Sequence, residues 1–162
     1  MTRLLVILAV LATAAPAWSQ TAPAPAATPA PSYGAPIGLE AAQALIDRAI
    51  AAAGERGFRM AVAIVEPSGE LVAFARMDDT QYGSIHVAQR KATTAARYRG
   101  ATSTMEERTL AGRTVTLANE DVLPIAGGIP IVVDGRIVGA IGVSGASAAQ
   151  DDEVARAALA PR

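Results

Sequence analysis

The side chain of this sequence best suited to bind a ligand is its single histidine, His86. If residues 83–97 form a helix, His86, Arg90, Thr93 and Arg97 lie together on its polar side. An imidazole can ligate a metal or titrate near neutral pH, and a planar guanidinium suits carboxylates. The spacing therefore predicts a helix side that can hold a metal or an anion. The alternative is that His86 is a solvated surface residue.

A second polar cluster precedes the same helix. Asp78 and Asp79 stand between a predicted strand at residues 71–75 and the helix at 83–97. Two neighbouring carboxylates can share a proton or bind a cation, so they are the candidate metal ligands. In the competing interpretation, one aspartate caps the helix and the other faces solvent.

Several other kinds of chemistry lack the residues they need. The chain has no cysteine, which excludes disulfides and haem attachment through Cys-x-x-Cys-His. No spacing around His86 fits a zinc site, no glycine pattern fits a dinucleotide or phosphate loop, and Ser144 lacks the hydrolase elbow. The formal charge is −1 and the arginines do not cluster, so a nucleic-acid partner is not expected.

Hydrophobic periodicity predicts the scaffold that carries these side chains. It indicates a helix at 38–53, a hairpin from 60–65 and 71–75, a helix at 83–97, a helix from a Ser103–Glu106 capping box to about Ala111, a hairpin around Asp134-Gly135, and a helix after a Ser147–Gln150 capping box. Residues 113–126 fit neither helix nor strand clearly. Hairpins without crossovers predict one α+β domain, with helices on the faces of a central antiparallel sheet.

The hairpin around Asp134-Gly135 has an unusual second strand. On one face it presents only Val138, Ala140, Gly142 and Ser144. Glycine within a strand marks a place where another element or a ligand comes close. Because the helix at 83–97 is lined with alanine, we expect it to pack closely on this bare face.

The amino-terminal part of the sequence predicts export from the cytoplasm. Arg3 precedes an apolar run, and Ala17-Trp18-Ser19 resembles a cleavage site, so residues 1–19 are expected to be a signal peptide. The run is shorter than the roughly 20 residues that span a bilayer, so no stable membrane insertion is expected. Residues 20–36, rich in proline and alanine, are predicted to be a disordered linker before a domain at 37–162. A periplasmic or secreted location follows.

The folded part carries a series of motifs in a recognisable order. They are Arg76-Met77-Asp78-Asp79, Lys91-Ala92-Thr93-Thr94-Ala95-Ala96, Gly112-Arg113-Thr114, residues 127–135, residues 139–145 and Gln150-Asp151. Together they resemble the GlcG/HbpS family of haem-binding-protein-like domains, over about residues 39–159. The resemblance implies a profilin-like α-β-α sandwich, often a homo-oligomer. Its secreted members bind haem, and the predicted signal peptide places this chain nearer to them.

If the resemblance extends to haem, the residues singled out above acquire roles. His86 is the candidate axial ligand, with Arg90 and Arg97 positioned for the propionates. The secondary ligand candidates are Tyr82, Met77, Tyr98 and Met105, and the favoured alternative for each is ordinary packing. A threonine has been implicated at the haem of secreted relatives, and Thr114 and Thr116 stay unassigned in that respect.

Three hypotheses for function remain open at this point. The first is a periplasmic or secreted module that sequesters, senses or protects against haem or a related tetrapyrrole. The second is an enzyme that degrades haem or acts on a glycolate-type hydroxy acid, against which stands the small number of titratable groups expected in a cleft. The third is an oligomeric accessory protein without a cofactor.

Overall fold

Strand β5, Arg136–Ser144, organises the sheet in this computed structural model, which describes residues 29–161. Its partners are β2 at Ala61–Val65 and β4 at Gly128–Val133, both antiparallel, and the short β1 at Ser32–Tyr33, which is parallel. Strand β3, Leu71–Arg76, pairs with β2 in the predicted first hairpin. β1 meets Arg136 and Ile137, whereas β2 pairs with β5 at residues 140–144. The two strands therefore share one edge of β5, and β4 takes the other.

The second hairpin forms where the sequence predicts it. Asp134 and Gly135 join β4 to β5, with φ of 48° and 72°. Two positive φ values in succession belong to the tight turn that matches the twist of antiparallel strands. The Asp-Gly pair thus sets the register of the hairpin, in which Ile131 lies opposite Gly139 and Val133 opposite Arg136.

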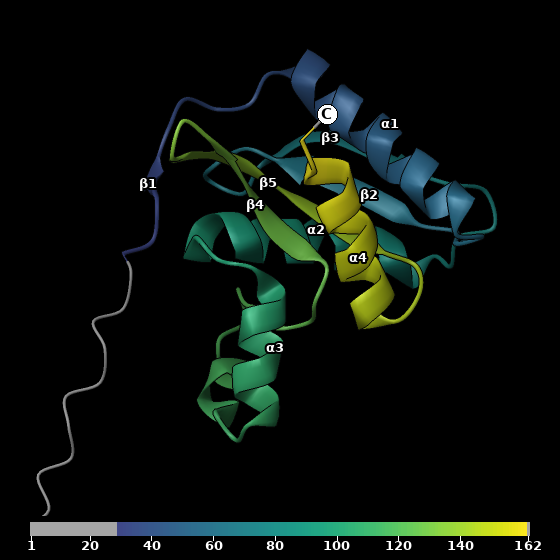
Figure 1. The fold of residues 1–162 in the computed structure, drawn as a ribbon. Coiled ribbons are helices and arrows are strands. Elements are labelled where there is room, and N and C mark those ends of the chain that lie inside the picture. Colours follow the sequence, from purple (N-terminus) through teal and green to yellow (C-terminus); the bar gives the residue numbers. More distant parts are fainter. Residues whose placement is uncertain (1–28, 162) are drawn as a thin grey trace, which may run out of the picture.

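Helices cover both faces of the sheet, which confirms the predicted α-β-α sandwich (Figure 1). Helix α1, Leu39–Glu55, and helix α4, Ala148–Leu159, pack side by side on one face. Helix α2, Gly83–Tyr98, covers the other. All five residues of β2 are buried, as expected for a strand between two helical layers.

Helix α2 lies very close to the sheet because glycine and alanine line the contact. A Cβ atom added at Gly142 would stand 2.0 Å from the Ala88 carbonyl oxygen and 2.6 Å from the Ala92 nitrogen. One at Gly128 would stand 2.3 Å from the Lys91 carbonyl oxygen. Real Cβ atoms do not come this near to backbone atoms, so both positions require glycine. The close packing expected on the bare face of β5 is confirmed at Ala140 and Gly142. Val138, predicted on the same face, instead packs against the core under α1 and α4, because the register between β4 and β5 shifts beside it.

The segment after α2 projects from the sandwich (Figure 1). Helix α3, Thr102–Leu110, buries only Thr102, and the residues left open by the sequence contain a 3-10 helix, η1, at Thr114–Ala118. The capping box predicted at Ser103 and Glu106 is wrong. The N-cap is Ala101, without a side-chain bond, two residues before the predicted cap, and at the first helical position the Thr102 hydroxyl accepts the Gly128 N–H at 2.9 Å. The box at Ser147 and Gln150 is present.

The amino-terminal segment reaches the sheet before residue 37. Residues 1–28, with the predicted signal peptide and the first half of the predicted linker, lie outside the described residues. The other half, 29–36, includes β1, and the Gly34 N–H donates to the Ile137 carbonyl at 2.8 Å. Contacts with the domain therefore begin at Ser32 rather than at residue 37. Among the described helices, none has the length and apolar character needed to cross a bilayer.

Candidate functional site

The outer face of α2 brings three of the predicted site residues together. His86, Arg90 and Arg97 line one surface hollow of about 430 Å³, which we call the His86 hollow. Its other lining residues are Gln89, Thr93, Glu120 and Asp121. The helical spacing of the three residues produces this arrangement, because positions four and eleven residues after His86 return to the same side of a helix. The volume falls within the range of small-molecule sites.

Both arginines of the His86 hollow already contact the protein around it. Arg90 donates through Nη2 to the Glu120 carbonyl at 3.0 Å. Arg97 donates through Nε to the Ser68 carbonyl at 2.7 Å, and its other nitrogens lie 3.6 Å from Glu70 and 3.9 Å from Asp121. These partners hold the two guanidinium groups at the rim, and because the ion pairs are solvent-exposed they are weak enough to exchange for a ligand carboxylate.

The far wall of the hollow is fixed by a buried hydroxyl. Thr94, on the inward side of α2, donates to the Asp121 carbonyl at 3.3 Å and accepts the Leu123 N–H at 2.9 Å. The loop with Glu120 and Asp121 is thereby tied to the helix that carries His86. His86 itself is exposed, and no described residue hydrogen-bonds its imidazole. Its nitrogens are accordingly accessible to a ligand from solvent.

The remaining predicted site residues lie elsewhere. Tyr82, Asp78 and Asp79 line a second hollow of about 510 Å³ with Arg76, whose guanidinium carbon stands 5.0 Å from the centre of the Tyr82 ring. Neither aspartate caps α2, whose N-cap is Tyr82. In the part of the chain that the structure describes, no three His, Cys, Asp or Glu side chains come together as a metal site. A cation here would have two carboxylates at most.

Met77 serves packing in this structure. Its side chain packs against the core under α1 and α4, and its sulfur accepts the Met60 N–H at 3.4 Å. The secondary candidates Tyr98 and Met105 instead share a small hollow of about 300 Å³ beside α3 with the unassigned Thr116, and the hollow also holds Arg108 and Arg113. Sequence reasoning named the first three separately but missed the two arginines. The Gly112-Arg113-Thr114 motif was the available indication of Arg113.

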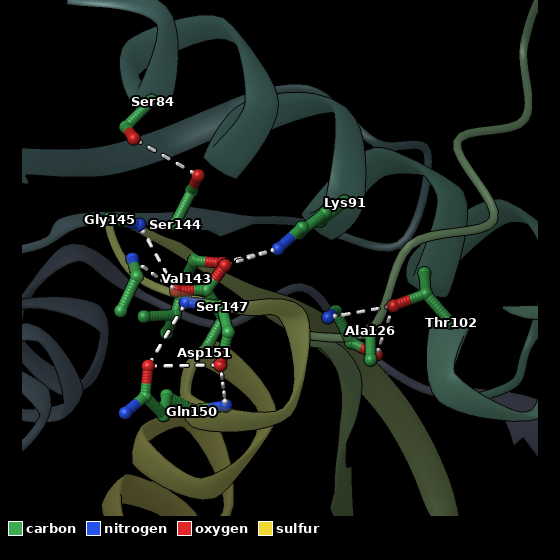
Figure 2. Close-up of polar contacts among 12 residues, drawn as sticks. Ser84, Lys91, Thr102, Ala126, Val143, Ser144, Gly145, Ser147, Gln150 and Asp151 are labelled. Atoms are coloured by element: carbon green, nitrogen blue, oxygen red, sulfur yellow. Dashed lines mark hydrogen bonds and ion pairs between the residues drawn. The ribbon is translucent and has the colours of Figure 1, made fainter. Parts of the chain in front are cut away.

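The inner face of α2 carries a buried ion pair that sequence reasoning also missed (Figure 2). The Lys91 Nζ lies 2.7 Å from Asp151 Oδ2, and it donates to the Val143 carbonyl at 3.1 Å. The exposed fractions of the two side chains are 1% and 3%. Asp151 Oδ1 accepts the N–H groups of Gly145 and Ala146, both at 3.0 Å. The pair joins α2, the end of β5 and the start of α4.

Burial dominates the titration of this pair. It raises the pKa of the Asp151 carboxyl above its ordinary value, although the Lys91 ammonium and the two backbone N–H groups act in the opposite direction. With all its polar atoms engaged inside the protein, the pair has no surface to offer a ligand. We therefore assign it a structural role, and the His86 hollow remains the better candidate for binding.

Comparison with known proteins identifies the domain. A family model described as "Haem degrading protein HbpS-like" matches residues 37–160. This chain belongs to the HbpS-like family. Protein GlcG of Escherichia coli K12 is 39% identical over 108 residues, covering 67% of this chain and 81% of GlcG.

Solved structures of HbpS-like domains have the same fold. A double mutant of HbpS from Streptomyces reticuli has a TM-score of 0.72 and 32% identity, covering 86% of this chain and 97% of that one. The structure of a PduOC:haem complex has a TM-score of 0.70 and 26% identity, covering 76% and 93%. One structural neighbour of this HbpS-like chain therefore holds haem.

Proposed function

We propose that the protein binds haem or a related tetrapyrrole in the His86 hollow and acts in haem sequestration, sensing or protection. The observation that carries the proposal is the meeting of the only histidine with two arginines in one surface hollow. His86 supplies the axial ligand that haem iron requires, and Arg90 and Arg97 supply partners for the propionates. The family match and the haem complex of the related PduOC domain support it.

The hollow is open on its outer side, so one copy of the chain covers only part of a haem. A second copy facing it would exclude water from the iron and add a second histidine. We accordingly propose a homo-oligomer in which haem lies at a boundary between subunits. A periplasmic or secreted location, proposed on the basis of the predicted signal peptide at 1–19, would expose the protein to free haem.

A haemin titration of the mature protein tests this proposal. The Soret band should shift with saturation at micromolar haemin, and the shift should be lost or strongly weakened in His86→Ala. The double variant Arg90→Gln/Arg97→Gln should weaken binding but keep the spectrum of the bound form, because it leaves the axial ligand in place. Absence of any Soret shift in the wild-type protein would refute the proposal.

Matched variants separate the His86 hollow from the other candidates. Met105→Leu and Met77→Leu preserve side-chain volume but remove a sulfur, and Tyr82→Phe and Tyr98→Phe remove only a hydroxyl. We expect all four to bind haemin as the wild type does. Loss of binding in Met105→Leu or Tyr98→Phe, with His86→Ala unaffected, would move the haem to the hollow beside α3.

Haem degradation is the second candidate function, because the matching family model is described by that activity. It requires the same haem complex and, in addition, loss of the Soret band when a reductant or peroxide is supplied. Release of iron, followed with a ferrous chelator, distinguishes enzymatic breakdown from bleaching when His86→Ala is run beside the wild type. A stable Soret band under these conditions leaves binding alone.

A further inference from the structure

A groove on the opposite side of the sheet from α2 has no role in the proposed function. It lies between the amino-terminal segment, α1 and the β4–β5 hairpin, and we call it the α1 groove. Figure 1 shows the position of these three elements. Its volume is about 570 Å³, which falls within the range of small-molecule sites. The lining residues are Ala35, Pro36, Ile37, Gly38, Ala41, Ala44, Leu45, Arg48, Ile131, Val133 and Val138.

The walls of the α1 groove are held by backbone contacts. The Ile37 N–H donates to the Val138 carbonyl at 2.8 Å, which fixes the amino-terminal wall against β5. On the opposite wall, α1 presents Ala41 and Ala44, whose small side chains leave the space open. Ile131 and Val138 form part of its floor and belong to the sheet core or pack against it. The groove therefore exists before any ligand arrives, which reduces the entropic cost of binding.

Among the described residues that line this groove, Arg48 alone has a polar side chain. It is half-buried, and its Nη2 donates to the Ala160 carbonyl. Among the described residues, no carboxylate lies within ion-pair distance of its guanidinium, whereas Arg56, the C-cap residue of the same helix, pairs with Glu153 at 2.7 Å. A guanidinium beside an apolar groove complements a carboxylate attached to an apolar body.

The position of Arg48 sets the shape of the ligand. Ala41 and Arg48 are seven residues apart on α1, a distance of about 10 Å along the helix axis. A chain lying from Ala41 towards Arg48 would cover apolar side chains until it reaches the charge. This geometry fits a molecule with one anionic end and an extended apolar part.

We propose that the α1 groove binds an aliphatic monocarboxylate of medium chain length, with the carboxylate on Arg48 and the alkyl chain between α1 and the β4–β5 hairpin. The site is independent of the His86 hollow, because the two lie on helices that cover opposite faces of the sheet. Binding of the carboxylate therefore goes beyond the proposed function and does not depend on haem.

Calorimetric titration with octanoate and with octanol tests the proposal on the full mature chain. The two probes share an apolar chain and differ in the charge of the head group. We expect octanoate to bind about tenfold more tightly than octanol, as a charge-assisted hydrogen bond at a partly exposed site implies. Equal affinities, or binding of neither probe, would overturn the proposal.

Variants on α1 then locate the site. Arg48→Gln should abolish the preference for octanoate, Arg48→Lys should keep part of it, and Arg59→Gln, an exposed arginine just beyond the helix, should leave it unchanged. Ala44→Phe should weaken both probes because it fills the groove. Unchanged octanoate affinity in both Arg48→Gln and Ala44→Phe would overturn the assignment.

The same measurements distinguish this proposal from two others. His86→Ala should keep full octanoate binding. The haem proposal and the carboxylate proposal can therefore be refuted independently of each other. The exposed residues Leu39, Val132 and Val133 add apolar surface on α1 and β4, the elements that flank the groove. If Ala44→Phe dissociates an oligomer in light scattering and octanoate does not bind, the groove belongs to a second copy of the chain and the proposal is wrong.

Discussion

Helix α2 carries a buried charge on its inner face and exposed charges on its outer face. On the inner face, Lys91 is the largest fully buried side chain in the described part of the chain, and its ammonium donates hydrogen bonds to the Val143 carbonyl and the Asp151 carboxylate. On the outer face, His86, Arg90 and Arg97 are exposed around a hollow. Both groups of residues lie on the same helix. The sheet beneath the helix buries one group and leaves the other accessible to a ligand.

The buried charge of α2 stabilises the fold, whereas its exposed charges are accessible to a ligand. Removing one member of a buried ion pair leaves the other charge buried without a partner, which strongly destabilises the fold. Exposed ion pairs exchange with water and contribute little to stability. Substitutions on the inner face should therefore change the free energy of unfolding. Those on the outer face should change ligand binding and leave stability nearly intact.

The largest effect is expected for Lys91→Met. It leaves the Asp151 carboxylate buried without its partner, which should lower the free energy of unfolding by about 3–5 kcal/mol. Urea unfolding followed by circular dichroism measures this loss. The double variant Lys91→Met/Asp151→Asn removes both charges and keeps the side-chain oxygen that accepts the N–H groups of Gly145 and Ala146. It should be more stable than Lys91→Met, and a double variant as unstable as the sum of the two single ones would contradict the pairing.

Gly142→Ala should have the next largest effect. The added methyl group would overlap the Ala88 carbonyl of α2, so helix and sheet must move apart, at a cost of about 1–3 kcal/mol. Gly54→Ala is the matched control, because this helical glycine of α1 has open space around its Cβ position. The control should be stabilised by about 0.5–1 kcal/mol. Equal responses of the two variants in thermal unfolding would show that α2 does not press on the sheet.

On the outer face, Arg97→Gln should cost less than about 1 kcal/mol. Its ion pairs with Glu70 and Asp121 are long and solvent-exposed, and the loss should shrink further in high salt. His86→Ala should change the free energy of unfolding by no more than about 0.5 kcal/mol. A loss above 2 kcal/mol in either variant, measured by urea unfolding, would mean that the outer face is structural as well.

The smallest predicted effect concerns pH. Burial raises the pKa of the Asp151 carboxyl above its ordinary value, so between the two values the native state binds more protons than the unfolded chain. Stability contributed by this group therefore falls as pH rises through that interval. As the pH rises above about 4, the ordinary pKa of an aspartate, the unfolding free energy of the wild type should fall more, or rise less, than that of Asp151→Asn. The opposite order would show that Lys91 and the backbone N–H groups outweigh burial.

Short sequence patterns predicted the local structure correctly where no distant contact competes with them. Asp134-Gly135 forms its turn, and Ser147 caps α4 with Gln150, because both signatures are complete within a few residues. The same capping pattern failed at Ser103. There the Thr102 hydroxyl bonds to Gly128 of β4, a contact across 26 positions that no local pattern contains.

In the candidate site, too, local spacing predicted some positions correctly and tertiary contacts determined the others. Helical spacing was enough to bring His86, Arg90 and Arg97 together, because all three lie on one element. It could not place Met77 and Tyr82, which lie in the loop before α2 and point to different surroundings. Lys91 falls on the inner face by the same spacing. Its partner Asp151 lies 60 residues away, so only the tertiary structure shows the pair.

The contact of Tyr33 with α2 has a consequence for how the protein is prepared. Its hydroxyl lies 3.0 Å from the Ala96 carbonyl and 2.9 Å from the Arg97 carbonyl, at the carboxyl end of the helix that carries His86. A recombinant domain cut at the conventional family boundary, residue 37, would remove this contact together with the β1 pairing. Ligand affinities measured on such a shortened protein would then describe a helix end that lacks the Tyr33 contact.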